Sequence, residues 1–91
     1  SGAYTTSEVL AEVVYVLAGV YQAKRTEIRE WLTALLEEIM IENKQCMLYA
    51  LKVYTETSLD FVDCLLVGYN HILRRRVFTF DKKLNRLLIE E

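Results

Sequence analysis

The chain has 91 residues, of which 53% are apolar and 26% are charged, and its formal net charge is −2. These values are typical of one folded domain spanning residues 1–91, and they exclude an intrinsically disordered chain and tight nucleic-acid binding over the whole surface. No uncharged stretch approaches about 20 residues and nothing resembles a signal peptide, so we expect a cytoplasmic protein without membrane contact.

Apolar residues spaced by three or four positions predict helices, and short apolar runs with β-branched or aromatic residues predict strands. The first half of the chain predicts a strand at 3–6, a helix at about 7–22 capped by Thr6 or Ser7, a helix from the cap Thr26 to about 38, and a strand at 39–41. The second half predicts a helix at about 44–56, a helix at about 59–74 capped by Ser58, and a strand at 77–80. A short amphipathic helix through Leu84, Leu87 and Leu88 follows. Strands that alternate with one or two helices predict an α/β fold, with helices on both faces of a small parallel sheet. Cys46 and Cys64 lack a disulfide spacing and are expected to be buried, reduced thiols.

Several acidic residues lie in apolar surroundings. Glu12 is the only charged residue between Val9 and Ala23, Asp60 and Asp63 interrupt an apolar helix, and Asp81 directly follows the strand predicted at 77–80. Burial of an unpaired carboxylate costs several kcal/mol, on the order of the stability margin of a small domain. A divalent cation shared by Glu12, Asp63 and Asp81 would compensate this cost, because hard cations prefer oxygen ligands.

The predicted sheet places these acids at one edge. Glu12 lies in the helix that leaves the first strand, Asp60 and Asp63 lie in the first turn of a helix that runs back to the strand at 77–80, and Asp81 ends that strand. All of them then stand at the carboxyl ends of parallel strands, where open α/β sheets bind ligands.

The same residues resemble a known family. The segments LDFVDCLL (59–66), VFTFDKKL (77–84) and LAEVV (10–14) are similar to motifs of PIN-domain nucleases, especially the virulence-associated protein C toxins of bacterial toxin–antitoxin pairs. The resemblance implies a PIN-like, three-layer α/β/α fold and an endoribonuclease that hydrolyses RNA with Mg²⁺ or Mn²⁺.

The resemblance also implies roles for individual residues. Glu12, Asp63 and Asp81 match the metal-site acids, Asp60 matches an auxiliary acid, and Thr79 matches the hydroxyl residue that holds a carboxylate or a water. An antitoxin-like protein is the partner that the resemblance implies, beside the RNA substrate.

One departure from the family pattern qualifies this interpretation. PIN domains begin with a central strand that ends in an aspartate, and no such strand precedes residue 3. We therefore expect an N-terminally incomplete domain with weak or no nuclease activity, whose unpaired strand edges favour homo-oligomers.

Simpler interpretations remain open for each acid. Glu12 can be an exposed or paired helical residue, Asp60 and Asp63 can complement a helix dipole, and Asp81 can be only an N-cap. For the whole chain, the alternatives are a non-catalytic interaction or oligomerisation module, and an all-helical bundle in which residues 39–41 and 77–80 never pair.

Overall fold

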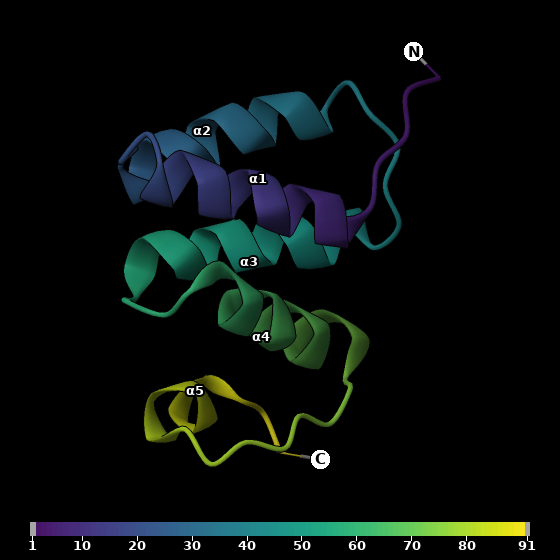
Figure 1. The fold of residues 1–91 in the computed structure, drawn as a ribbon. Coiled ribbons are helices and arrows are strands. Elements are labelled where there is room, and N and C mark those ends of the chain that lie inside the picture. The colour runs from purple at the N-terminus through teal and green to yellow at the C-terminus, as the bar shows by residue number, and fades with distance from the viewer. Residues whose placement is uncertain (1, 91) are drawn as a thin grey trace.

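The computed structural model describes residues 2–90, which form five helices (Figure 1). The helices are α1 (Ser7–Gly19), α2 (Arg25–Leu36), α3 (Lys44–Glu56), α4 (Phe61–Leu73) and α5 (Lys82–Leu87). The closest pair is α3 and α4, while α2 packs on α3, and α1 contacts both α2 and α4. Helix α5 lies at the end of the molecule remote from α2 (Figure 1). None of these helices is long and apolar enough to cross a membrane.

Side chains that accept backbone hydrogen bonds fix where three helices begin. Thr6 caps α1 by accepting from the N–H of Val9, as the sequence predicts. Asp60 and Asp81 cap α4 and α5 in the same way. A side-chain cap satisfies one of the N–H groups that the first turn leaves without a partner, and it stabilises a helix by about 1 kcal/mol.

The core forms where α3 and α4 meet, and a glycine permits their close approach. A Cβ atom built on Gly68 lies 2.5 Å from the carbonyl oxygen of Cys46, so a larger residue does not fit there. The buried apolar side chains of α1, α2, α3 and α4 join this contact in one cluster, including Leu10, Ile28, Leu36, Met47, Ala50, Leu51 and Val67. Cys46 and Cys64 are buried and free, as predicted.

The predicted parallel sheet is wrong. Among residues 2–90 there is no strand, and the only β pairing is one isolated parallel bridge between Tyr4 and Met40. Here Thr5 N–H donates to the Met40 carbonyl at 3.0 Å and Met40 N–H donates to the Ala3 carbonyl at 2.8 Å. Within residues 2–90, the segment 77–80 has no β partner.

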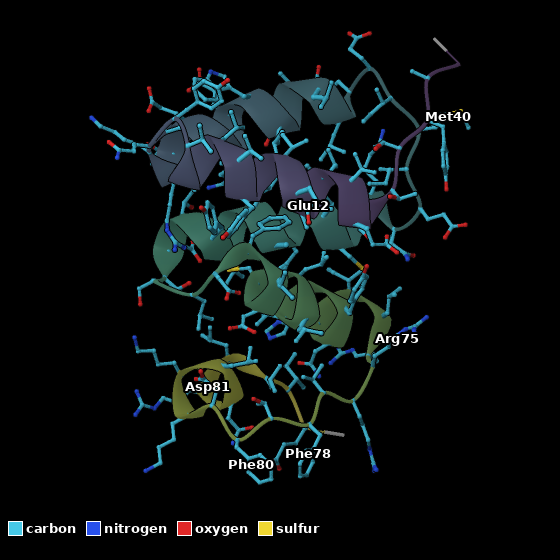
Figure 2. All side chains as sticks on the ribbon, viewed as in Figure 1. Glu12, Met40, Arg75, Phe78, Phe80 and Asp81 are labelled. Carbon is cyan, nitrogen blue, oxygen red and sulfur yellow. The ribbon has the colours of Figure 1, made fainter. Side chains whose placement is uncertain are left out.

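The extended segments fail to form a sheet because they lie at different ends of the molecule. Met40 is at one end, and Phe78 and Phe80 are at the other, with helices between them (Figure 2). Sheet strands must lie about 4.8 Å apart to share hydrogen bonds. Apart from the Tyr4–Met40 bridge, the described chain therefore matches the all-helical alternative and not the three-layer α/β/α fold.

Two side chains of α4 hold the C-terminal part of the chain. Asn70 is 2% exposed, and its side-chain NH₂ donates to the carbonyls of Arg75 and Ile89 while its oxygen accepts from the N–H of Ile89. His71 Nε2 donates to the Leu87 carbonyl, and His71 Nδ1 lies 2.8 Å from the hydroxyl of Tyr49. These contacts place α5, and with it Asp81, beside α4.

Candidate functional site

Two of the predicted site acids begin α4. The Asp60 carboxylate accepts a 3.0 Å hydrogen bond from the backbone N–H of Asp63, so Asp60 is the N-cap of this helix. Asp60 is exposed, and Asp63 is half-buried in the first turn. Both positions lie at the positive end of the helix dipole, which favours a carboxylate there.

A third acid begins α5. The Asp81 carboxylate accepts from the N–H of Leu84 at 3.1 Å, and the Thr79 hydroxyl accepts from the N–H of Asp81 at 3.0 Å. Thr79 thus fixes the backbone conformation at Asp81. Because Asp81 uses one carboxylate oxygen as a cap, its second oxygen remains open to another ligand.

The charges of these three acids act on one another. Burial raises the pKa of Asp63, and the neighbouring charges of Asp60 and Asp81 raise it further, as does the hydrogen bond between the Asp60 and Asp63 side chains. Asp60, Asp63 and Asp81 thus form one acidic cluster, in which the half-buried Asp63 carries the electrostatic cost.

Glu12 does not join the acidic cluster. It is exposed on α1, and its charge is not among the causes that raise the pKa of Asp63. Figure 2 shows Glu12 and Asp81 at separate places on the molecule. The predicted reason for their convergence, a common sheet edge, is absent from residues 2–90 because no sheet forms there.

A family model described as PIN domain matches residues 1–88. The chain belongs to the PIN domain family. Proteins with this domain are generally metal-dependent nucleases and typically bind divalent metal ions. Comparisons with curated proteins and with solved structures give no match.

The acids of this PIN domain do not form a metal site as they are arranged. In residues 2–90, no group of three or more histidine, cysteine, aspartate or glutamate side chains is placed to hold a metal ion. Two carboxylates of the acidic cluster already accept backbone hydrogen bonds, and Glu12 lies elsewhere. Oxygen donors of the right kind are present, but the described residues alone do not fit the ion.

Basic side chains lie next to the acidic cluster of this PIN domain. Lys83 Nζ lies 3.4 Å from the hydroxyl of Ser58, which bridges α5 to the loop before α4. Lys83 and Arg86 line a hollow of about 280 Å³ between α5 and residues 57–59. Cations beside the acids give this region of the surface both signs of charge.

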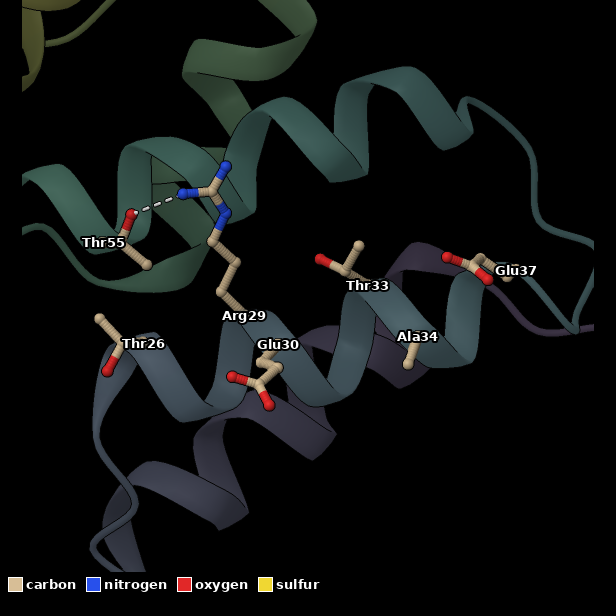
Figure 3. Close-up of a pocket in the computed structure, with 7 residues that line it drawn as sticks. All are labelled: Thr26, Arg29, Glu30, Thr33, Ala34, Glu37 and Thr55. Atoms are coloured by element: carbon tan, nitrogen blue, oxygen red, sulfur yellow. Dashed lines mark hydrogen bonds between the residues drawn. The ribbon is translucent and has the colours of Figure 1, made fainter.

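A larger hollow, of about 460 Å³, lies elsewhere on the molecule (Figure 3). It runs over α2 and the C-terminal part of α3, and the Arg29 guanidinium crosses it to donate to the Thr55 hydroxyl at 3.3 Å. It shares no lining residue with the acidic cluster. Its lining carries no histidine or cysteine, and we assign it no chemistry.

Sequence reasoning missed the residues that position the acids. The Arg25 guanidinium donates to the carbonyls of Tyr54, Thr57, Ser58 and Leu59, and so holds the loop that leads to Asp60. Asn70 and His71 hold the chain on either side of α5. Asn70 is a polar residue within an apolar helix, and this was the one signal in the sequence that pointed to a buried hydrogen-bonding role.

Proposed function

We propose that this PIN domain is a metal-dependent endoribonuclease of toxin–antitoxin type in which Asp63 and Asp81, aided by Asp60, are metal-site acids. The observation that carries the proposal is the convergence of these three carboxylates at the first turns of α4 and α5. The cluster contains no cation among the groups that shift the pKa of Asp63. Mg²⁺ or Mn²⁺ would relieve the repulsion within it.

The same geometry leads us to expect weak or absent activity in the 91-residue chain. Asp60 and Asp81 each commit an oxygen to a helix cap, and Glu12, the third predicted ligand, lies apart from Asp81 (Figure 2). We therefore propose that ion binding is weak and that RNA cleavage by this chain alone is slow or undetectable. A cytoplasmic location is part of the same proposal.

Single-stranded or structured RNA is the substrate that we propose. Lys83 and Arg86 line the hollow beside the acidic cluster, so a phosphate of the RNA backbone can meet a cation there. The net charge of the whole chain is slightly negative, so contact with RNA phosphates depends on a local basic patch such as this one.

Manganese titration tests the metal-site proposal. We expect weak, saturable Mn²⁺ binding by electron paramagnetic resonance or calorimetry, and we expect Asp63→Asn to abolish it. Glu30→Gln, which removes an exposed acid of α2 remote from the cluster, is the matched control and keeps the binding. Binding that is absent, or that is equal in both variants, contradicts the proposal.

An RNA-cleavage assay tests the second part. The purified chain with Mn²⁺ is expected to leave a mixed RNA substrate almost intact over hours. Robust cleavage that EDTA stops would show that the site is complete and that weak activity is the wrong inference.

A non-catalytic interaction module is the second candidate function. It is favoured by the exposure of Phe78 and Phe80, which are large apolar side chains without cover. Self-association that does not respond to Mn²⁺, together with absent metal binding, would favour this candidate over the nuclease.

A further inference from the structure

One arginine of α2 joins the end of α3 to the loop before α4. The half-buried Arg25 guanidinium donates to the carbonyls of Tyr54 and Thr57, where α3 ends. It also donates to the carbonyls of Ser58 and Leu59, in the loop itself. Its central carbon lies 4.0 Å from the centre of the Tyr54 ring. Because that ring is 3% exposed and packed in the core, the cation–π contact gives the guanidinium a fixed place.

The chemistry of a guanidinium suits the carbonyls at the end of α3. The last carbonyls of any helix lack partners within it and lie at the negative end of its dipole. A guanidinium carries five N–H donors in a planar fork, so one side chain can meet several carbonyls at once. Residues 57–60 are the whole connection between α3 and α4. Arg25 therefore holds most of that connection.

The connection ends at the acids of α4. Asp60 directly follows Leu59, and its carboxylate caps the helix by accepting from the N–H of Asp63. The Leu59 carbonyl also accepts a weak hydrogen bond from the Cys64 thiol, at 3.9 Å, so this carbonyl is tied to the first turn of α4 as well as to Arg25. A shift of Leu59 would therefore move this turn and the Asp63 carboxylate on it.

The same loop meets α5. Lys83 Nζ donates to the Ser58 hydroxyl at 3.4 Å. Lys83, Arg86 and Leu87 line the hollow of about 280 Å³ together with residues 57–59. Asp81 is the N-cap of α5 and stands two residues before Lys83. The loop that Arg25 holds is thus in contact with the helix that Asp81 begins.

We infer that Arg25 is a positioning residue of the acidic cluster, which sets the separation of the Asp63 and Asp81 carboxylates by holding the loop at 57–59. The inference rests on the proposed function and deepens it, because one Mg²⁺ ion binds two carboxylates only when an oxygen of each reaches it at about 2.0–2.1 Å. Arg25 is not among the groups whose charge shifts the pKa of Asp63. It therefore acts through the loop and not by neutralising the cluster.

A purely structural Arg25 makes a different prediction. If Arg25 only stabilises the chain, its replacement lowers the free energy of unfolding and leaves the separation of Asp63 and Asp81 unchanged in the folded protein. If Arg25 positions them, repulsion separates the two carboxylates once the loop is released, and their electrostatic coupling weakens with distance. This coupling is measured as the fall in the Asp63 pKa that Asp81→Asn causes.

Carboxyl-carbon NMR titration of Asp63 tests the inference, in the native chain and in Arg25→Gln, each with and without Asp81→Asn. Because the same substitution is compared in two backgrounds, the direct effect of removing the Arg25 charge cancels. We expect the fall in the Asp63 pKa to be at least halved in Arg25→Gln. Arg25→Lys keeps the charge but lacks the planar fork, and it should give the same reduction if Arg25→Gln does not fold.

Two other variants of α2 are the matched controls. Arg29→Gln removes a neighbouring cation, whose guanidinium donates to the Thr55 hydroxyl (Figure 3). Leu36→Ala removes a buried side chain at the other end of α2 and lowers stability. Both variants should keep the full fall in the Asp63 pKa.

Each outcome decides a different part of the proposal. An equal fall in the native and Arg25→Gln backgrounds overturns the positioning role and leaves the acidic cluster in place. A fall reduced as much in Leu36→Ala as in Arg25→Gln also overturns it, because lost stability then explains the effect. If Asp81→Asn causes no fall in the native chain, the acidic cluster and the proposed function fail together with the positioning role. Absent Mn²⁺ binding with an intact Arg25 effect contradicts the metal site alone.

Discussion

Replacement of Asn70 by alanine should release the C-terminal part of the chain from α4. Asn70 is 2% exposed and makes three hydrogen bonds, two to Ile89 and one to Arg75. The net contribution of each hydrogen bond is about 1 kcal/mol, and the variant also leaves three backbone groups without partners. We expect Asn70→Ala to lower the free energy of unfolding by about 3 kcal/mol, a large share of the 5–15 kcal/mol typical of a domain.

Urea unfolding, followed by circular dichroism, measures this loss. Hydrogen exchange read by mass spectrometry should show that residues 75–90 lose protection first, because Asn70 ties both ends of that stretch. Asn85→Ala is the matched control, since Asn85 is exposed on α5, and it should change stability by less than about 0.5 kcal/mol. If Asn70→Ala behaves like Asn85→Ala in both assays, the reasoning about α5 is wrong.

The remaining predictions concern the core, the loop before α4, the acidic cluster and the thiols. Gly68→Ala should destabilise the chain by about 2–3 kcal/mol in urea unfolding, because its Cβ meets the Cys46 carbonyl, and a neutral effect would contradict the close approach of α3 and α4. Arg25→Lys should cost about 1–2 kcal/mol in the same assay, since one ammonium group cannot reach all the carbonyls that the guanidinium holds; unchanged stability would show that these contacts carry no weight. The pKa of Asp63 is raised above its ordinary 3.8, so the folded chain binds the Asp63 proton more tightly than the unfolded chain and loses stability as pH rises above 3.8. Asp63→Asn should abolish that loss and be more stable than the native chain at pH 7 in urea unfolding. A variant less stable than the native chain at pH 7 would refute this pH dependence. Burial raises the pKa of Cys64 to about 11 and also raises the pKa of Cys46. Neither thiol should therefore react with a disulfide reagent at pH 8 until denaturant is added. Rapid reaction of the native chain would show that one of the thiols is accessible.

The helices were predictable from the sequence because they depend on local features. Apolar spacing located α1 to α4, and the predicted span of 44–56 agrees with the observed α3. Starting points were less certain where several residues can cap. Ser58 was the predicted cap of α4, but Asp60 caps this helix. Helix α2 begins one residue before the predicted cap Thr26, and the Glu27 carboxylate accepts a hydrogen bond from the N–H of Lys24.

The sheet was not predictable because strand pairing depends on distant residues. Residues 39–41 and 77–80 have the local composition of strands, and only one bridge, at Met40, forms in the described chain. The local sequence pattern indicates that a segment favours an extended conformation, but it does not show whether another strand lies close enough to pair with it.

The acidic cluster was predicted in part, and for a different reason from the one that holds it together. A common sheet edge was expected to gather the acids, whereas Asp60, Asp63 and Asp81 meet because two helices begin side by side. The predicted place of Glu12 beside the other acids depended on the sheet alone, and Glu12 lies apart from Asp81 (Figure 2). Helix caps are local features, so Asp60 and Asp81 stand at the starts of α4 and α5 although the predicted sheet is absent from the described residues.

Carboxyl-carbon NMR titration of Asp63, in the native chain and in Asp81→Asn, tests most directly that these acids share one place. Asparagine keeps the cap of α5 and removes only the charge. We predict that Asp63 titrates above the ordinary aspartate value in the native chain and that its pKa falls in Asp81→Asn. An Asp63 that titrates at the ordinary value and does not respond to Asp81→Asn would contradict the acidic cluster and the nuclease proposal built on it.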